Sequence, residues 1–489
     1  MDRATPRSNP NYDVYFSDEK IKTVVERCLP FVKRDHMIIE HLPSGKSFNN
    51  RIYFVNLTEP VRTLRPEWNG SEVEVTKTTT QIQSSFLVLK IAGHPFGRNK
   101  VQNEVACLLL LEKHCPSIPA PKLLAWSDDG KKVRTPQYPR GFRDTEPKNI
   151  PVLAIKAEDG TPIEDVRKDT EGQGWILMTR EPGRPISPDE LSGSAGDELM
   201  RKIAVYVATW RKDMPPAKAV GNLRIVGSNS TPQPAAVRYD KAILPGYEVH
   251  IDGLITNHSP PSPLTTSEKY HAFVLKNSLK RLKDGKLYDH TSDEVHELVK
   301  RMADNTLPKL PMFRYGIEPM IFTHDDLSTR NVLVSPDPSG DVKVSAIIDF
   351  EFAGFFPKEE EFANTLQNDQ EEWPLKKYAV FLSELKDREA LPETLTLKIP
   401  PPSSVGKAGD KCFEFGTGEF QQAVLLLRTT INTAPWWIKE EQGYNAEQLQ
   451  EEMEAAKARV EKAVKWLEEM VPAEEREKRS RRRTNSTRG

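Results

Sequence analysis

The chain has 489 residues and a formal net charge of −2, from 69 basic and 71 acidic residues. A chain of this length predicts about three structural units, and it can bury a large core without disulfides or metals. The balanced charge argues against nucleic acid as a partner, and no run of about 18 apolar residues is present that could cross a membrane.

Residues 1–35 form a predicted N-terminal extension. Residues 1–16 are polar, are expected to pack loosely, and lack the apolar core of a secretory signal. A helix is predicted from Ser17, whose hydroxyl can cap it, to near Pro30. Because the four cysteines show neither disulfide nor metal-site spacing, the expected location is the reducing cytoplasm.

Residues 36–180 are predicted to form a strand-rich lobe. Compact apolar runs predict five strands, at 36–42, 51–57, 85–92, 122–126 and 175–179. Apolar residues at three- and four-residue spacings predict one strong helix over 100–114. Two polar stretches, 58–82 and 128–172, lack periodicity and are expected to be insertions.

Residues 181–472 are predicted to form a larger lobe that is mostly helical. Helical periodicity predicts five helices, at 194–212, 266–284, 292–304, 416–432 and 445–470. Two short apolar strands, 320–324 and 344–349, interrupt this pattern. Residues 473–489 form a basic tail that is expected to be disordered, and its KRSRRR run leaves a nuclear location open.

The most informative motif is HDDLSTRNVLV, which begins at His324 and is followed by SAIIDFEFAG, which contains Asp349. An apolar strand delivers His324 and Asp326 into a loop, where Asp326 can accept the proton of a substrate hydroxyl. Asn331 and Asp349 offer two hard oxygen ligands, which suit a Mg²⁺ ion that also touches nucleotide phosphates. The competing interpretation is an Asp-rich turn between two strands.

The pattern HxDxxxxN followed by IIDFEFAG resembles the aminoglycoside phosphotransferase and choline kinase-like family, most closely the fungal proteins that carry this domain. The resemblance covers about 36–430 and implies an α+β, bilobal protein kinase-like fold. A small β-rich N-lobe and a larger α-rich C-lobe would hold ATP and Mg²⁺ between them. The resemblance further implies that Asp326, with His324, is catalytic and that Asn331 and Asp349 bind the metal.

Two further segments are implied as nucleotide contacts by this resemblance. Lys90 ends an apolar strand and would hold the phosphates, while Glu104 on the following helix would hold Lys90. The segment ILMTREPG resembles the hinge between the lobes, with Met178 as an apolar neighbour of the adenine. The Thr179 carbonyl and the Glu181 N–H would hold the base. Without the resemblance, Lys90 and Glu104 would be ordinary solvated residues and the hinge a buried strand that meets a turn.

The segment SGKSFNN, residues 44–50, is the third candidate for nucleotide contact. Its backbone N–H groups and the Ser47 hydroxyl could cover phosphates, with Asn49 beside them. The segment is not a Walker A motif, because Glu40 stands where the first glycine would be required. A plain β-hairpin loop is the alternative.

Together these features predict an ATP- and Mg²⁺-dependent phosphotransferase that acts on a hydroxyl of a small molecule. The alternative is a catalytically weak kinase-like protein that serves as a nucleotide-binding or regulatory module. Asp325 and the two insertions at 58–82 and 128–172 favour this alternative, because aminoglycoside kinases usually carry glycine at position 325 and the aspartate adds negative charge near the metal site. A protein kinase proper is disfavoured by the missing GxGxxG loop. Aminoglycosides, choline-like amines, sugars, nucleosides and secondary metabolites all stay open as acceptors, as do GTP as the donor and the oligomeric state.

Overall fold

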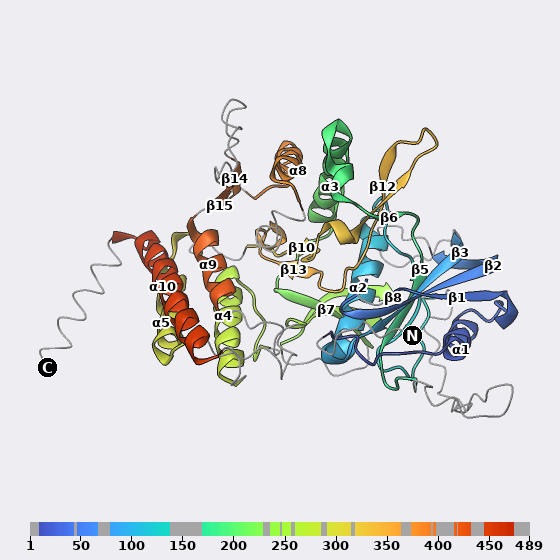
Figure 1. The fold of residues 1–489 in the computed structure, drawn as a ribbon, viewed down its shortest axis with the longest axis horizontal. Coiled ribbons are helices and arrows are strands. Elements are labelled where there is room, and N and C mark those ends of the chain that lie inside the picture. The colour runs from blue at the N-terminus through green and yellow to red at the C-terminus, as the bar shows by residue number, and fades with distance from the viewer. Residues whose placement is uncertain are drawn as a thin grey trace, which may run out of the picture.

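An antiparallel five-stranded sheet with one long helix against it forms the first lobe (Figure 1). Its strands are β1 (Met37–His41), β2 (Asn50–Pro66), β3 (Thr79–Ala92), β4 (Leu123–Ser127) and β5 (Trp175–Thr179). They are hydrogen-bonded in the order β1-β2-β3-β5-β4, and the helix is α2 (Gly97–His114). The computed structural model describes residues 9–43, 46–66, 79–136, 169–227, 235–244, 247–255, 260–284, 291–313, 318–362, 373–392, 395–397, 415–417, 419–431 and 445–473.

Alternation along β3 decides which of its side chains face the helix. Leu87, Leu89 and Ile91 are fully buried in one apolar cluster of the first lobe. Because successive side chains of a strand point to opposite faces, Lys90 points the other way, towards α2. The strand therefore carries a charged group into the interior between the sheet and the helix.

The N-terminal extension packs against the sheet. Helix α1 (Asp18–Cys28) begins where the sequence predicts. Before it, Val14 and Phe16 are buried in the core of the first lobe, and Phe16 N donates a hydrogen bond of 2.8 Å to Tyr53 Oη. The prediction of loose packing is therefore wrong for residues 9–16, because these two apolar side chains anchor the segment. The first eight residues lie outside the described ranges.

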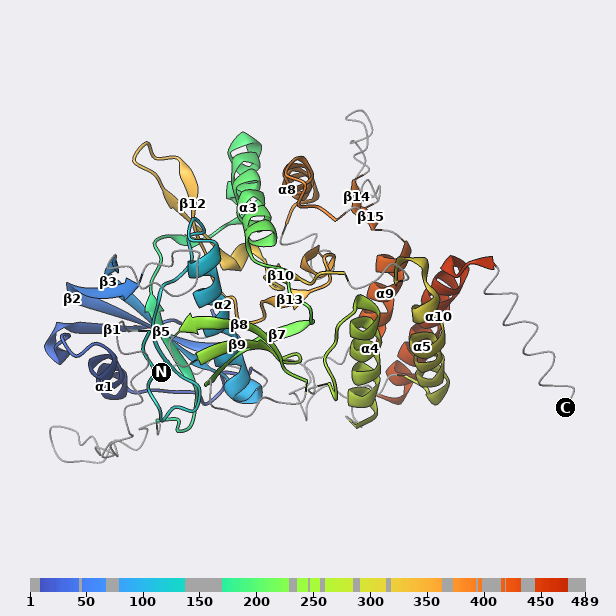
Figure 2. The ribbon, with the colours of Figure 1, turned by 180° about the vertical axis from the view of Figure 1, so that it is seen from behind.

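Long helices dominate the second lobe. They are α3 (Gly193–Asp213), α4 (Ser267–Asp284), α5 (Asp293–Asn305), α8 (Leu375–Asp387), α9 (Glu419–Thr430) and α10 (Ala446–Met470). Helices α4, α5, α9 and α10 enclose an apolar core of their own, at the end of the molecule away from the first lobe (Figures 1 and 2). The sequence predicts all of these helices except α8, with ends that agree to within a few residues.

Several strands of the second lobe are absent from the sequence-based prediction. A five-stranded sheet has the order β10-β13-β7-β9-β8, and a smaller one has the order β12-β11-β6. Their strands are β6 (Arg184–Pro185), β7 (Gly221–Gly227), β8 (Val237–Leu244), β9 (Tyr247–Ile251), β10 (Ile321–Thr323), β11 (Val332–Pro336), β12 (Val342–Ile347) and β13 (Gly354–Phe356). A further pair consists of β14 (Leu395–Leu397) and β15 (Phe415–Thr417). Only β10 and β12 were expected, because most of the others are short, bulged or buried on both faces and lack a clean alternation.

The two predicted insertions have different outcomes. The stretch 58–82 is partly a longer hairpin, because β2 continues to Pro66 and β3 begins at Thr79, with a bulge between Asn56 and Val61. Most of the stretch 128–172 lies outside the described residues, as does the basic tail from residue 474 onwards. Short 3-10 turns complete the described chain, at Arg34–His36, His94–Phe96, Pro188–Leu191, Leu307–Lys309, Pro311–Phe313 and Thr329–Asn331. Among the described helices, none combines the length and the apolar character needed to cross a membrane.

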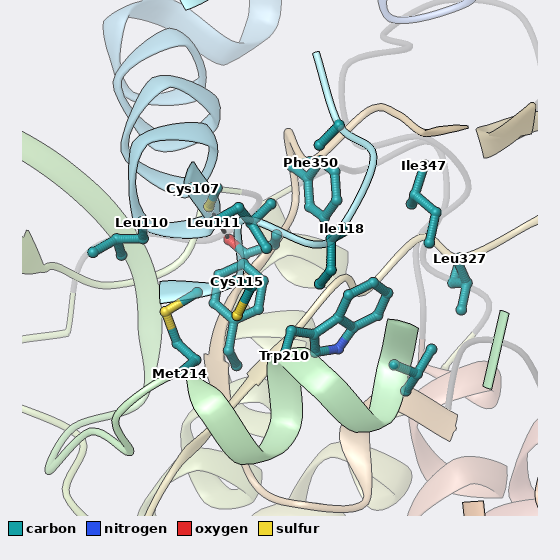
Figure 3. Close-up of a cluster of buried hydrophobic side chains, with 14 of the residues drawn as sticks. Cys107, Leu110, Leu111, Cys115, Ile118, Trp210, Met214, Leu327, Ile347 and Phe350 are labelled. Carbon is teal, nitrogen blue, oxygen red and sulfur yellow. Dashed lines mark hydrogen bonds between the residues drawn. The ribbon is translucent and has the colours of Figure 1, made fainter. Parts of the chain in front are cut away.

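A shared apolar core lies beneath the segment that carries the motif. Figure 3 shows Cys107 and Leu111 of α2 next to Phe350 and Trp210. The rings of Trp210 and Phe350 meet edge to face, with centroids 6.2 Å apart. Because Phe350 follows Asp349 directly, this core fixes the backbone of the predicted metal ligand.

Candidate active site

Lys90 lies at the centre of a cluster of three carboxylates. Its Nζ is 2.7 Å from Glu104 Oε2, 2.5 Å from Asp349 Oδ1 and 2.9 Å from Glu351 Oε2. Burial lowers the pKa of this lysine, but Asp349, Glu104 and Glu351 outweigh burial and raise the pKa well above its usual value. The predicted pair of Lys90 and Glu104 thus meets the predicted metal ligand Asp349, 259 residues further along the chain than Lys90.

Helix α2 is fixed to the second lobe by Asn103, the residue before Glu104. Asn103 Nδ2 donates to the carbonyl oxygens of Glu351 at 2.8 Å and Ala353 at 2.9 Å. Its Oδ1 accepts from the Leu223 N–H of β7 at 2.6 Å, and Figure 2 shows the β7–β9 strands beside α2. The helix that carries Glu104 therefore has one defined position relative to the segment around Asp349.

Two aspartates of the site adopt a left-handed backbone conformation. Asp325 has φ of 61° and Asp349 has φ of 67°. This region favours glycine, and aspartate is among the few other residues that adopt it at modest cost. Asp325 therefore adopts a backbone conformation in which glycine is common, and the loop accommodates its side chain there.

His324 lies behind the loop. Its side chain is fully buried, its Nε2 is 3.0 Å from the Ile348 carbonyl oxygen, and the Asp326 N–H donates to its Nδ1 at 3.3 Å. These partners place the ring proton on Nε2. Burial lowers the pKa of His324 to about 4, so the ring is neutral at physiological pH. The geometry suits a group that positions Asp326 from behind.

Asp326 and Asn331 face each other within the loop that follows β10. Asn331 Nδ2 donates to the Asp326 carbonyl oxygen at 2.8 Å and to Asp326 Oδ2 at 3.0 Å. Burial, followed by the charge of Asp349, raises the pKa of Asp326 to about 7. Because Asn331 Nδ2 donates its hydrogen bonds to Asp326, Asn331 Oδ1 is the atom that can bind a metal.

Two acidic residues after β13, Glu360 and Glu361, point inwards. Glu361 Oε2 accepts from the His324 N–H at 3.0 Å and from Trp210 Nε1 at 3.2 Å. Glu360 Oε1 accepts from Tyr270 Oη at 2.8 Å and from Arg428 Nη1 at 2.6 Å. Both glutamates are buried, so they support the loop around Asp326 from within. Sequence reasoning missed this role, and the signal available for it was a run of glutamates that begins three residues after a fully apolar strand.

The second residue after Asp349 is also absent from the sequence-based list of site residues. Glu351 is fully buried, and its two oxygens accept from Asn49 Nδ2 at 2.9 Å and Asn50 Nδ2 at 2.6 Å. The ammonium group of Lys100 lies 3.3 Å from the same carboxylate. These contacts bring the predicted loop residue Asn49 to the site, and they direct its amide at Glu351. The available signal was the DFE spelling at the point where a protein kinase carries DFG.

The predicted hinge residues follow the edge of the first sheet. Met178 is buried on β5 and pairs with Val88, two residues before Lys90 on β3. Thr179 Oγ1 accepts from the Lys122 N–H at 2.8 Å and donates to Glu181 Oε1 at 2.7 Å. Since strand side chains repeat every second residue, Met178 and Val88 share the face that carries Lys90. Met178 therefore has the placement expected of a neighbour of the base.

The chemistry of the donor set fits a hard divalent cation. Asp349 offers a carboxylate and Asn331 an amide oxygen, the kinds of ligand that Mg²⁺ takes beside nucleotide phosphates. Oxygens of Glu104, Asp349 and Glu351 also lie within 4.8 Å of one another. The Lys90 ammonium contacts all three carboxylates of that trio, so Asp349 with Asn331 stays the pair that the motif predicts for the metal.

A sequence model of the phosphotransferase enzyme family matches residues 61–392 of the chain. Among solved structures, the chain is similar to an aminoglycoside phosphotransferase bound to ADP, at 12% identity and a TM-score of 0.45, covering 92% of this chain and 98% of that one. It is also similar to a choline kinase from Cryptosporidium parvum, at 12% identity and a TM-score of 0.37, covering 93% of this chain and 96% of that one. Among curated proteins, no sequence matches the chain.

The family match spans more than half of the chain and includes Lys90, Glu104, Asp326, Asn331 and Asp349. It confirms the resemblance that the motifs carry. The strand-rich first lobe and the helix-rich second lobe agree with the expected bilobal, kinase-like α+β fold. The chain belongs to the phosphotransferase enzyme family.

Proposed function

We propose that the protein is an ATP- and Mg²⁺-dependent phosphotransferase that acts on a hydroxyl group of a small molecule. The observation that carries this proposal is the convergence of Lys90, Glu104 and Asp349 at one point, next to the loop that holds Asp326 and Asn331. Phosphoryl transfer depends mainly on positioning and on neutralising charge, and these residue types supply both.

In the proposed reaction the acceptor oxygen attacks the γ-phosphorus of ATP and the bond to the β–γ bridging oxygen breaks, so that ADP leaves. The hydroxyl proton passes to Asp326, whose pKa of about 7 suits a base near neutral pH. Asn331 orients Asp326 through its amide, and His324 supports the same loop from behind. Bound Mg²⁺, held by Asn331 Oδ1 and Asp349, would neutralise phosphate charge.

The nucleotide is proposed to lie along the face of the first sheet that carries Lys90. Lys90 would hold the phosphates, and Glu104 would keep the lysine in place. Met178 would contact the base, with the Thr179 carbonyl and the Glu181 N–H as its polar partners. The loop with Ser47 and Asn49 would cover the phosphates.

The alternative of a catalytically weak module rests on Asp325 and on the insertions at 58–82 and 128–172. Asp325 takes up a left-handed backbone conformation in which glycine is common, so the argument from this residue is the negative charge that it adds, not the shape of its backbone. All five residues expected to bind and react, from Lys90 to Asp349, are present in the chain.

The experiment that tests the proposal is a turnover assay with Mg²⁺–ATP and a metabolite extract, read by mass spectrometry as a gain of one phosphate. Asp326→Ala is expected to lower turnover at least ~10²-fold while nucleotide binding stays close to wild type. Asp304→Ala, on the distant helix α5, serves as the matched control. Near-wild-type turnover in Asp326→Ala would remove the proposed base, and a wild type that neither turns over nor binds nucleotide would refute the function.

A further inference from the structure

We propose that the N-terminal extension contributes to nucleotide binding by fixing the conformation of a loop in the nucleotide site. In this inference Asn11 of the extension and Glu351 of the second lobe hold the loop at 46–50 from opposite sides, in the shape that receives the phosphates. The inference rests on the proposed function and deepens it, because it names the residues that set nucleotide affinity.

Asn11 makes the contacts from the side of the extension. Its side chain is only 4% exposed, and its Nδ2 donates to the carbonyl oxygens of Ser47 and Asn50, both at 2.8 Å. One amide therefore connects the two ends of the turn. Because a trans peptide points its C=O and the following N–H in opposite directions, the Phe48 N–H is turned away from the extension.

The second set of contacts comes from the other side of the loop. Glu351 accepts hydrogen bonds from the side-chain amides of Asn49 and Asn50. The Asn49 carbonyl oxygen accepts from Lys100 Nζ and from the Gly93 N–H, each at 3.0 Å. Lys100 is itself almost fully buried, so this contact is shielded from water. The loop is thus tied at both asparagines.

These hydrogen bonds explain how a loop without the GxGxxG pattern can be ordered to contact phosphates. A glycine-rich loop reaches phosphates through its own conformational freedom, at an entropic cost when it becomes ordered. Here external side chains order the loop before any ligand arrives, which lowers the cost of binding. The two asparagines of SFNN supply the amides that Glu351 requires.

The extension can hold the loop in place because it is itself hydrogen-bonded to the first lobe. The His94 N–H donates to the Pro10 carbonyl oxygen at 3.0 Å, and Phe16 is held at Tyr53. A Cβ atom at Gly93 would lie 2.7 Å from the Pro10 oxygen, so this close approach requires glycine. The extension precedes the stretch matched by the family, 61–392, so the device is a feature of this chain beyond that match.

The test compares Asn11→Ala with Asn9→Ala, a matched control two residues earlier whose side chain makes no hydrogen bond among the described residues. Calorimetry with ADP and with Mg²⁺ plus a non-hydrolysable ATP analogue should give nucleotide binding about tenfold weaker in Asn11→Ala and unchanged in Asn9→Ala. The nucleotide KM should rise with it, while the acceptor KM stays near wild type. Hydrogen exchange of peptide 46–57 without ligand should be faster in Asn11→Ala only.

Melting curves accompany each variant. If Asn11→Ala fails to fold, Asn11→Leu keeps the size of the side chain and removes the two donated hydrogen bonds without adding a charge. It should show the same loss of nucleotide affinity. Equal nucleotide affinity in folded Asn11→Ala or Asn11→Leu and in wild type would overturn the inference alone. A wild type that binds no nucleotide would overturn the proposed function, and this inference with it.

Discussion

At the scale of single residues, the balance of charge in the buried cluster is informative. Three carboxylates, Glu104, Asp349 and Glu351, share two ammonium groups, Lys90 and Lys100. The cluster thus carries one formal negative charge in excess, in an interior where unbalanced charge is costly. A divalent cation bound at Asp349 would offset this excess, so the cluster is suited to a cation of this kind.

A double-mutant cycle tests whether Lys90 and Glu104 act as a pair. Lys90→Met should abolish most turnover, and Glu104→Gln should reduce it less because the lysine remains but is poorly placed. The double variant should be no worse than Lys90→Met, since Glu104 acts only through the lysine. Turnover of the four proteins is measured, with melting curves to confirm folding. Additive losses would show that the two residues work independently.

Residues whose spacing reflects chemistry could be predicted from the sequence. Asp326, Asn331 and Asp349 stand in a fixed order around two apolar strands, and the structure places the first two in direct contact. Asn11 and Glu351 could not be found in this way. Asn11 donates to backbone oxygens 36 and 39 residues away, and such contacts produce no periodic pattern in the sequence. The partners of Glu351 lie about 300 residues away from it along the chain.

At the scale of elements, α4 contributes two buried polar side chains that lie close to Glu360 and Arg428. Tyr270 donates to Glu360, and the neighbouring ring of His271 is buried beside the same glutamate and Arg428. Burial lowers the pKa of His271 to about 4, against the pull of Glu360. The His271 ring is therefore neutral where α4 packs against its neighbours.

The neutral ring of His271 makes stability depend on pH. Between about pH 4 and 6.5 the unfolded chain binds a proton that the buried ring does not, so stability falls as the pH falls through this window. His271→Phe should remove about 2 kcal/mol of the loss in unfolding free energy between pH 7 and pH 5. Urea unfolding at both pH values measures it, with the exposed His94→Phe as a control. An unchanged loss in His271→Phe would contradict the assignment.

The elements that escaped prediction share a physical cause. The helix α2 was found because its apolar residues recur over 18 positions. In the strands β7 and β9, several consecutive residues are buried, and the pairing of β9 with β8 is bulged. An alternation of apolar and polar residues therefore does not mark these strands in the sequence. Their position is set by tertiary contacts such as the bond between Asn103 and Leu223.

At the scale of the whole molecule, the outer helices form a unit with its own core, and Glu360 links that unit to the loop that follows β10. Tyr270 on α4 and Arg428 on α9 both reach this one carboxylate. Glu360 lies one residue before Glu361, which holds the loop at His324. Helices α4 and α9 are thus connected to the loop at His324 through two adjacent residues.

Replacing Arg428 should lower the free energy of unfolding more than removing the hydroxyl of Tyr270. Arg428→Met leaves a buried carboxylate without its cation, at a cost of about 3–5 kcal/mol, whereas Tyr270→Phe should cost about 1.5–3 kcal/mol. The double variant Glu360→Gln/Arg428→Met should be more stable than Arg428→Met alone, because no unpaired charge remains. Denaturant unfolding of the variants decides the order. A smaller loss in Arg428→Met than in Tyr270→Phe would refute the link.

The three hydrogen bonds of Asn103 have a consequence for regulation. In protein kinases the helix that carries the lysine-binding glutamate can move, and its position controls activity. Here that helix is joined by one amide to the segment after Asp349 and to β7, so a movement of the helix would break three buried hydrogen bonds. Turnover is therefore expected to begin without a lag and without prior phosphorylation of the protein. Control of such an enzyme would rest on its supply of acceptor and nucleotide.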